Sequence, residues 1–129
     1  MRLLVDTHVL LWWQNDNPRL SRAARAVLAD PRHNISISIV SFWEMSIKFR
    51  QGKLDAAGSV TLRRAIDEQM DILDIKRDHL TALETLPDRP DHKDPCDRLI
   101  LSQALSEQIP LMTGDRMMTG YGVSCIGVG

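Results

Sequence analysis

The chain has 129 residues, of which 43% are hydrophobic and 26% are charged, and its formal net charge is −1. This length suits one domain with a substantial core, and the near-neutral charge argues against a protein that coats nucleic acid through a general positive field. The longest apolar run, Val9 to Trp13, is too short for a membrane span, and the two cysteines, Cys96 and Cys125, are too few for a disulfide framework. We therefore expect one domain over residues 1–129 and a cytoplasmic location.

The N-terminal half of the chain alternates strand and helix patterns. Arg2–Val5 is typical of a buried strand, and it stops at Asp6, which is placed to cap a helix over Thr7–Trp13. The other elements expected in this half are a helix from Ser21 through Leu28, a strand over 34–40 that ends near Ser41, and a helix that starts at Ser41, with Glu44 in capping-box spacing, and stops near Gly52.

The C-terminal half continues the alternation with shorter elements. Asp94 and Pro95 form a strong start signal for a helix that runs through Gln108. The other elements expected here are a helix over Thr61–Met70, a strand over Ile72–Ile75, a short helix over His79–Leu86, a loop over 87–94, a short strand within 110–115 and a last strand within 123–128.

Strands that alternate with helices at this spacing predict βαβ units, and hence a mostly parallel sheet with helices on both faces. In such folds the ligand site lies beyond the carboxyl ends of the strands. That edge is where functional residues are expected.

Four acids stand just after a predicted strand or near the start of a predicted helix: Asp6, Glu44, Asp97 and Asp115. Taken singly, each has a structural explanation as a helix cap, a first-turn acid or a turn residue. Taken together, they should converge at the carboxyl edge of the sheet. Carboxylates about 4 Å apart repel by up to roughly 4 kcal/mol per pair near a protein surface, and a divalent cation removes that repulsion.

Oxygen ligands without a His or Cys partner favour Mg²⁺ or Mn²⁺ over zinc. Such a cation activates water and stabilises charge on a phosphoryl oxygen, which indicates a phosphodiester substrate. The residues expected to support the site are Thr7, Asp94 and Thr113 around the metal, and Lys48, Arg98 and Arg116 against phosphates. A helical ion pair with Glu44 is the alternative for Lys48, and solvated surface charge is the alternative for the two arginines.

The segments LLVDTHVLLWW, SFWEMSIKFRQGKL, HKDPCDRLILSQA and LMTGDRMMTGYGV occur in this order and span nearly the whole chain. They resemble the motif blocks of PIN-domain ribonucleases, specifically the VapC-like toxins of bacterial toxin–antitoxin modules. The combination of WEMSIK, GKL and DPCDR is far more specific than any single acid.

The resemblance implies a three-layer α/β/α sandwich and a metal-dependent endoribonuclease whose four-acid site maps onto Asp6, Glu44, Asp97 and Asp115. It also implies a homodimer and a cognate antitoxin that covers an apolar groove and blocks the active site. Cys96 departs from the family pattern, because an aromatic residue usually stands there, and Met118 lies near a second position where an aromatic is frequent.

Three other functions fit parts of the sequence. A phosphoryl-transfer domain with an aspartyl nucleophile usually has a second carboxylate two residues after the first, and His8 stands at that place. A metal-free ribonuclease would use histidines for acid–base chemistry, but the four histidines are scattered. A binding module would use the acids only as caps and the apolar groove to hold a partner.

Trp12 and Trp13 are adjacent on one predicted helix. Because neighbouring helix positions point about 100° apart, both cannot face the same core, and at least one is a candidate for a partner surface.

Overall fold

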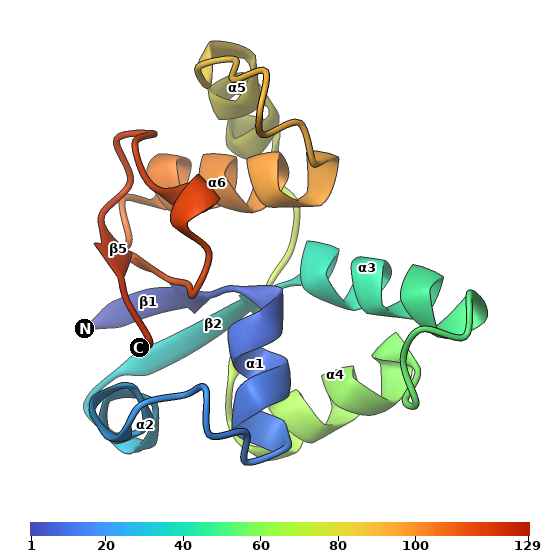
Figure 1. The fold of residues 1–129 in the computed structure, drawn as a ribbon. Helices are drawn as coiled ribbons and strands as arrows, with labels where there is room; N and C mark the ends of the chain where they lie inside the picture. The colour runs from blue at the N-terminus through green and yellow to red at the C-terminus, as the bar shows by residue number, and fades with distance from the viewer.

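A computed structural model describes residues 1–129. Its centre is a five-stranded sheet in the order β3-β2-β1-β4-β5, in which every neighbouring pair is parallel (Figure 1). The strands are β1 (Arg2–Val5), β2 (Asn34–Ser38), β3 (Asp71–Leu73), β4 (Leu111–Met112) and β5 (Cys125–Ile126). The helices are α1 (Thr7–Gln14), α2 (Arg22–Ala29), α3 (Ile39–Arg50), α4 (Gly58–Asp67), α5 (Arg77–Thr85), α6 (Pro95–Glu107) and a short 3₁₀ helix, η1 (Arg116–Met118).

Helices cover both faces of the sheet, which confirms the expected three-layer α/β/α architecture (Figure 1). Side chains of β1 alternate between two apolar cores: Leu3 and Val5 pack with α1, α2 and α4, and Leu4 packs with α6 on the other face. A parallel sheet enclosed in this way needs apolar residues on both faces of its central strands. No helix combines the length and the apolarity needed to cross a lipid bilayer.

The start of α3 differs from the sequence prediction. The helix begins at Ile39, and Ser38 is its N-cap, because the Ser38 hydroxyl accepts the Val40 backbone N–H. Ser41, expected to be the cap in a box with Glu44, is instead buried in the first turn. The apolar pair after Ser38 resembles a continuing strand, but the pairing of β2 with its neighbours ends at Ser38, so the chain turns into a helix there.

The middle elements are displaced by a few residues from their expected positions. Helix α4 begins at Gly58, three residues before the expected Thr61, and its cap residue, Ala57, makes no side-chain cap hydrogen bond. A start without a capping side chain leaves no signal in the sequence. Helix α5 begins at Arg77, two residues before the expected His79, and His79 Nδ1 accepts the Lys76 backbone N–H at this start.

A buried polar network joins α6 to the sheet and to α5. The Ser38 hydroxyl donates to the Gln103 side chain, and both residues are fully buried. His79 is also fully buried and bonds Glu107 through Nε2 at 2.9 Å. This bond is the main reason that the pKa of Glu107 falls to about 2. Satisfied networks of this kind set the position of one element against another more uniquely than apolar contacts do.

The close approach of α3 and α4 depends on Gly58. A Cβ atom at this position would lie 2.3 Å from the Phe42 carbonyl oxygen and 2.3 Å from Ser46 Oγ. We expect Gly58→Ala to lower the free energy of unfolding by about 2 kcal/mol, because α4 must move away from α3. Denaturant unfolding measures the loss. Gly127→Ala is the control, since nothing lies within 4 Å of its Cβ position; equal stability of the two variants would contradict the packing argument.

Candidate metal centre

Asp6 is the most constrained of the four acids. It follows β1, caps α1 and is only 4% exposed. Its Oδ1 accepts the Thr7 backbone N–H and its Oδ2 accepts the Thr113 hydroxyl, both at 2.8 Å. Burial raises the pKa of Asp6 above its ordinary value of 3.8, and the nearby Asp115 adds a small contribution in the same direction. The structure thus holds a carboxylate in a place where its negative charge is poorly solvated.

Asp97 lies in the first turn of α6 and is held by a histidine that the sequence argument left unassigned. His92 Nε2–H donates to Asp97 Oδ2 at 3.0 Å, and His92 Nδ1 accepts the Tyr121 hydroxyl at 2.8 Å. The assignment follows because a carboxylate only accepts hydrogen bonds. Burial, together with smaller contributions from the neighbouring carboxylates of Asp94 and Asp6, raises the pKa of Asp97 to about 6 despite this hydrogen bond.

Asp115 stands in the loop after β4, on the same edge of the sheet. Its backbone N–H donates to Thr113 Oγ1 at 3.0 Å, and Thr113 in turn donates to Asp6. Ligand atoms of Asp97, Asp115 and His92 lie within 4.8 Å of one another. The structure therefore brings together the acids that follow β1, begin α6 and follow β4, as the parallel topology predicts.

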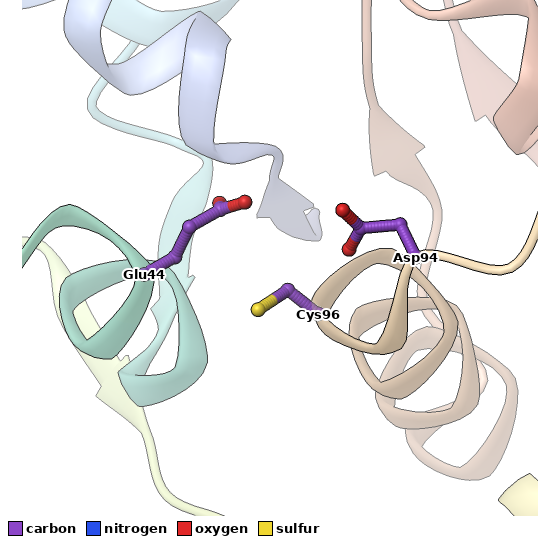
Figure 2. Close-up of side chains that lie close together, drawn as sticks. All are labelled: Glu44, Asp94 and Cys96. Carbon is purple, nitrogen blue, oxygen red and sulfur yellow. The ribbon is translucent and has the colours of Figure 1, made fainter. Parts of the chain in front are cut away.

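Glu44 comes to this edge from α3 and faces Asp94 and Cys96 at the start of α6 (Figure 2). One ligand atom from each of the three residues lies within 4.8 Å of the other two. Asp94 Oδ1 accepts the Asp97 backbone N–H, which is the cap expected for α6. Lys48 lies one helical turn beyond Glu44, with Nζ at 3.6 Å from Glu44 Oε2, so the helical ion pair is formed.

Thr7 connects the start of α1 to α3. Its hydroxyl donates to Ser41 Oγ at 2.7 Å, and both residues are buried. Thr7 is therefore engaged in holding two helices together beside Asp6. Ser41 was expected only as a cap, and its contact with Thr7 joins residues 34 positions apart, which no local pattern in the sequence shows.

The two candidate arginines lie in different surroundings. The Arg98 guanidinium donates to the carbonyl oxygens of Leu86 and Pro87 and to the Asp88 carboxylate. Arg116 is exposed, and its side chain makes no hydrogen bond or ion pair. Arg98 thus holds the loop before α6, and Arg116 is the arginine that stays free beside Asp115.

A sequence model of the PIN domain matches residues 3–122 of the chain. The chain belongs to the PIN-domain family. Ribonuclease VapC22 of Mycobacterium tuberculosis (strain ATCC 25618 / H37Rv) is 26% identical over 120 residues, an alignment that covers 92% of this PIN-domain chain and 91% of the relative.

Solved structures share the PIN-domain fold at lower identity. A chain in the crystal structure of VapBC2 from Rickettsia felis bound to a promoter DNA fragment has a TM-score of 0.77 and 18% identity, with 100% of each chain covered. A chain in the structure of VapBC-1 from nontypeable Haemophilus influenzae has a TM-score of 0.70 and 18% identity, with 98% of each chain covered. At these identities the likeness establishes the fold.

The donor set of this PIN domain fits a divalent cation. Asp6, Asp97 and Asp115 offer carboxylate oxygens from three separate segments, and no basic side chain forms an ion pair with Asp6 or Asp115. Both ring nitrogens of His92 already have hydrogen-bond partners, which leaves oxygen as the ligand type. Oxygen-only donor sets suit Mg²⁺ and Mn²⁺.

The raised pKa of Asp97 gives a test in the absence of metal. An acid whose pKa is higher in the folded state than in the unfolded chain weakens the fold once it ionises. The penalty therefore develops as the pH rises from 3.8 to about 6 and is complete above that range. In EDTA at neutral pH, Asp97→Asn should stabilise the protein by about 1 kcal/mol, which is less than the shift alone implies because the carboxylate is partly hydrated.

Thermal unfolding of the wild type and Asp97→Asn measures this difference. In acid below the ordinary Asp pKa the two proteins should converge, since Asp97 is then protonated in both states. Mg²⁺ should stabilise the wild type and not the variant. A variant that is less stable than the wild type in EDTA would contradict the raised pKa of Asp97 in the folded protein.

Proposed function

We propose that this chain is a Mg²⁺- or Mn²⁺-dependent endoribonuclease and the toxin of a toxin–antitoxin pair. The observation that carries the proposal is the arrangement at the carboxyl edge of a PIN-domain sheet, where Asp97 and Asp115 have ligand atoms within 4.8 Å of each other and the Thr113 hydroxyl bonds both the Asp6 carboxylate and the Asp115 backbone. Its relative at 26% identity is named a ribonuclease, which supports RNA as the substrate.

In this proposal Asp6, Asp97 and Asp115 hold the cation. When bound, the cation lowers the pKa of a coordinated water and neutralises charge on the phosphate. Glu44 then accepts a proton from the attacking water, whose oxygen forms a bond to phosphorus as the bond to the 3′ oxygen breaks. The departing 3′ oxygen takes up a proton from solvent, so the products are a 5′-phosphate and a 3′-hydroxyl.

The residues around the acids set their positions. Thr113 orients Asp6 and the backbone of Asp115, and His92 orients Asp97. Thr7 and Asp94 hold the starts of α1 and α6, so the carboxylates are placed before substrate arrives. Pre-placed charges of this kind do not need to reorganise during the reaction.

The RNA backbone requires positive charge beside this acidic edge. Lys48 and Arg116 supply it, because Lys48 is paired only with Glu44 and Arg116 has no partner. We propose that both contact phosphates of the bound strand. Arg98 acts indirectly, since its guanidinium is occupied by the loop that carries His92.

The test is cleavage of total cellular RNA by the purified chain with Mg²⁺ or Mn²⁺. EDTA and Asp97→Asn should each lower the rate at least roughly a hundredfold, because metal stabilisation of the transition state amounts to several kcal/mol. Asp67→Asn is a matched control on the exposed surface of α4 and should cleave like the wild type. Cleavage that survives EDTA would exclude the metal mechanism, and no cleavage with either metal would favour a binding module.

Partner proteins are the second part of the proposal. The matched structures carry the name VapBC, and one is described as bound to promoter DNA. We propose a homodimer and a cognate antitoxin for this chain.

The candidate partner surface includes exposed apolar side chains. Trp43 and Ile47, one turn apart on α3, are 57% and 40% exposed, and Val60 on α4 is 60% exposed. Trp43 and Ile47 share one face of α3, and neighbouring exposed apolar side chains of this kind mark protein contacts. Trp12 and Trp13 are each half-buried, so Trp43 is the tryptophan most available to a partner.

Trp43→Ser should weaken either the dimer or the antitoxin complex at least roughly tenfold, since a buried tryptophan is a common energetic centre of an interface. Light scattering of the free chain measures the dimer, and titration with the cognate antitoxin measures the affinity of the antitoxin complex. Leu80→Ser on α5, at a residue 49% exposed in the other layer, is the control. If both assemblies tolerate Trp43→Ser, the α3 face is not a partner surface.

A further inference from the structure

Cys96 is a buried thiol without a hydrogen-bond partner. The residue is 8% exposed, and its Sγ atom forms no hydrogen bond. The other cysteine differs, because Cys125 Sγ lies 3.7 Å from the Met118 carbonyl oxygen and 3.6 Å from that of Val123. The Cys96 side chain points toward the gap between α3 and the start of α6, where Glu44 faces it (Figure 2).

Two carboxylates point into the same gap. Glu44 Oε, Asp94 Oδ and Cys96 Sγ lie within 4.8 Å of one another. Asp94 uses Oδ1 for the cap of α6, which leaves Oδ2 free, and Glu44 has only the 3.6 Å ion pair with Lys48. In a tetrahedral zinc site, sulfur and oxygen ligands stand roughly 3.6 Å apart. Side-chain movements of about 1 Å would bring these three atoms to that spacing.

We propose that Cys96, Glu44 and Asp94 form a site for a thiophilic divalent cation, with Zn²⁺ as the natural occupant. A thiolate favours zinc and cadmium, whereas Mg²⁺ requires oxygen ligands, so this site discriminates against the cation proposed for Asp6, Asp97 and Asp115. The three side chains supply three ligands and solvent supplies the fourth. As the metal–sulfur bond forms, the thiol proton passes to solvent.

The site has a consequence for activity that rests on the proposed ribonuclease function. Glu44 is a ligand of this site and also the proposed proton acceptor of the cleavage reaction, so a zinc ion that holds Glu44 removes it from the attacking water. Zn²⁺ should then inhibit RNA cleavage in the presence of excess Mg²⁺.

The binding step is tested without any activity measurement. Cd²⁺ is added to the full-length chain in buffer with excess Mg²⁺, and the ultraviolet absorption of the cadmium–thiolate bond is recorded. The wild type and Cys125→Ser should give the absorption with saturation at one equivalent, and Cys96→Ser should give none. Glu44→Gln and Asp94→Asn keep both cysteines and should weaken binding at least roughly tenfold. Far-ultraviolet circular dichroism verifies that each variant is folded.

Several results would overturn the site. These are an absorption that persists in Cys96→Ser and disappears in Cys125→Ser, one that is unchanged by both carboxylate variants, or no absorption in the wild type. The last result would show that Cys96 serves packing only. The Glu44→Gln and Asp94→Asn variants keep the test decisive if Cys96→Ser fails to fold.

Inhibition is measured separately with Zn²⁺ and the RNA substrate. The Zn²⁺ concentration that halves cleavage should rise at least tenfold in Cys96→Ser and stay unchanged in Cys125→Ser. Cadmium binding without any RNA cleavage would support the cation site and reject the proposed ribonuclease function. Cleavage that Zn²⁺ inhibits equally in Cys96→Ser would reject the regulatory role of the site.

Discussion

The hydrogen bond from Thr113 to the buried carboxylate of Asp6 connects the two strand ends on which the candidate centre is built. Asp6 follows β1, Thr113 follows β4, and the Asp6 backbone N–H also donates to the Met112 carbonyl oxygen at 2.9 Å. Thr113 accepts the backbone N–H of Asp115 with the same oxygen that it uses to donate to Asp6. The Thr113 hydroxyl thus fixes the positions of two acids. Without it, the buried carboxylate of Asp6 would lose one of its hydrogen bonds.

A second set of contacts holds the other side of the centre. Arg89 donates to the carbonyl oxygens of Met117 and Thr119, and its guanidinium lies 4.9 Å from the centre of the Tyr121 ring. These contacts tie the loop before α6 to the segment after β4. His92 lies in that loop and therefore reaches Asp97 with a defined orientation. The position of the Asp97 carboxylate therefore depends on the loop directly before α6 and, through Arg89 and Tyr121, on the segment after β4.

The acids are arranged against their own electrostatic preference. Burial raises the pKa of both Asp6 and Asp97, which means that folding places negative charge where water solvates it poorly. Such a site stores unfavourable energy that a bound cation can release. The same principle explains why the apolar layers on both faces of the sheet must be well packed, since they stabilise a fold whose functional edge is destabilising.

The sequence by itself determined the order of strands and helices, the parallel sheet and the caps Asp6 and Asp94, because apolar periodicity and capping are local properties of the chain. It also singled out four acids as candidates, since each stands next to a strand end or helix start. Tertiary structure alone decided that Ser38 begins α3, that His92 holds Asp97, and that Glu44 meets Asp94 and Cys96. The reason is physical: where β2 stops pairing, how Tyr121 fixes the His92 ring and which helix start faces Glu44 all depend on segments far apart in the chain, and local patterns carry no information about which segments meet.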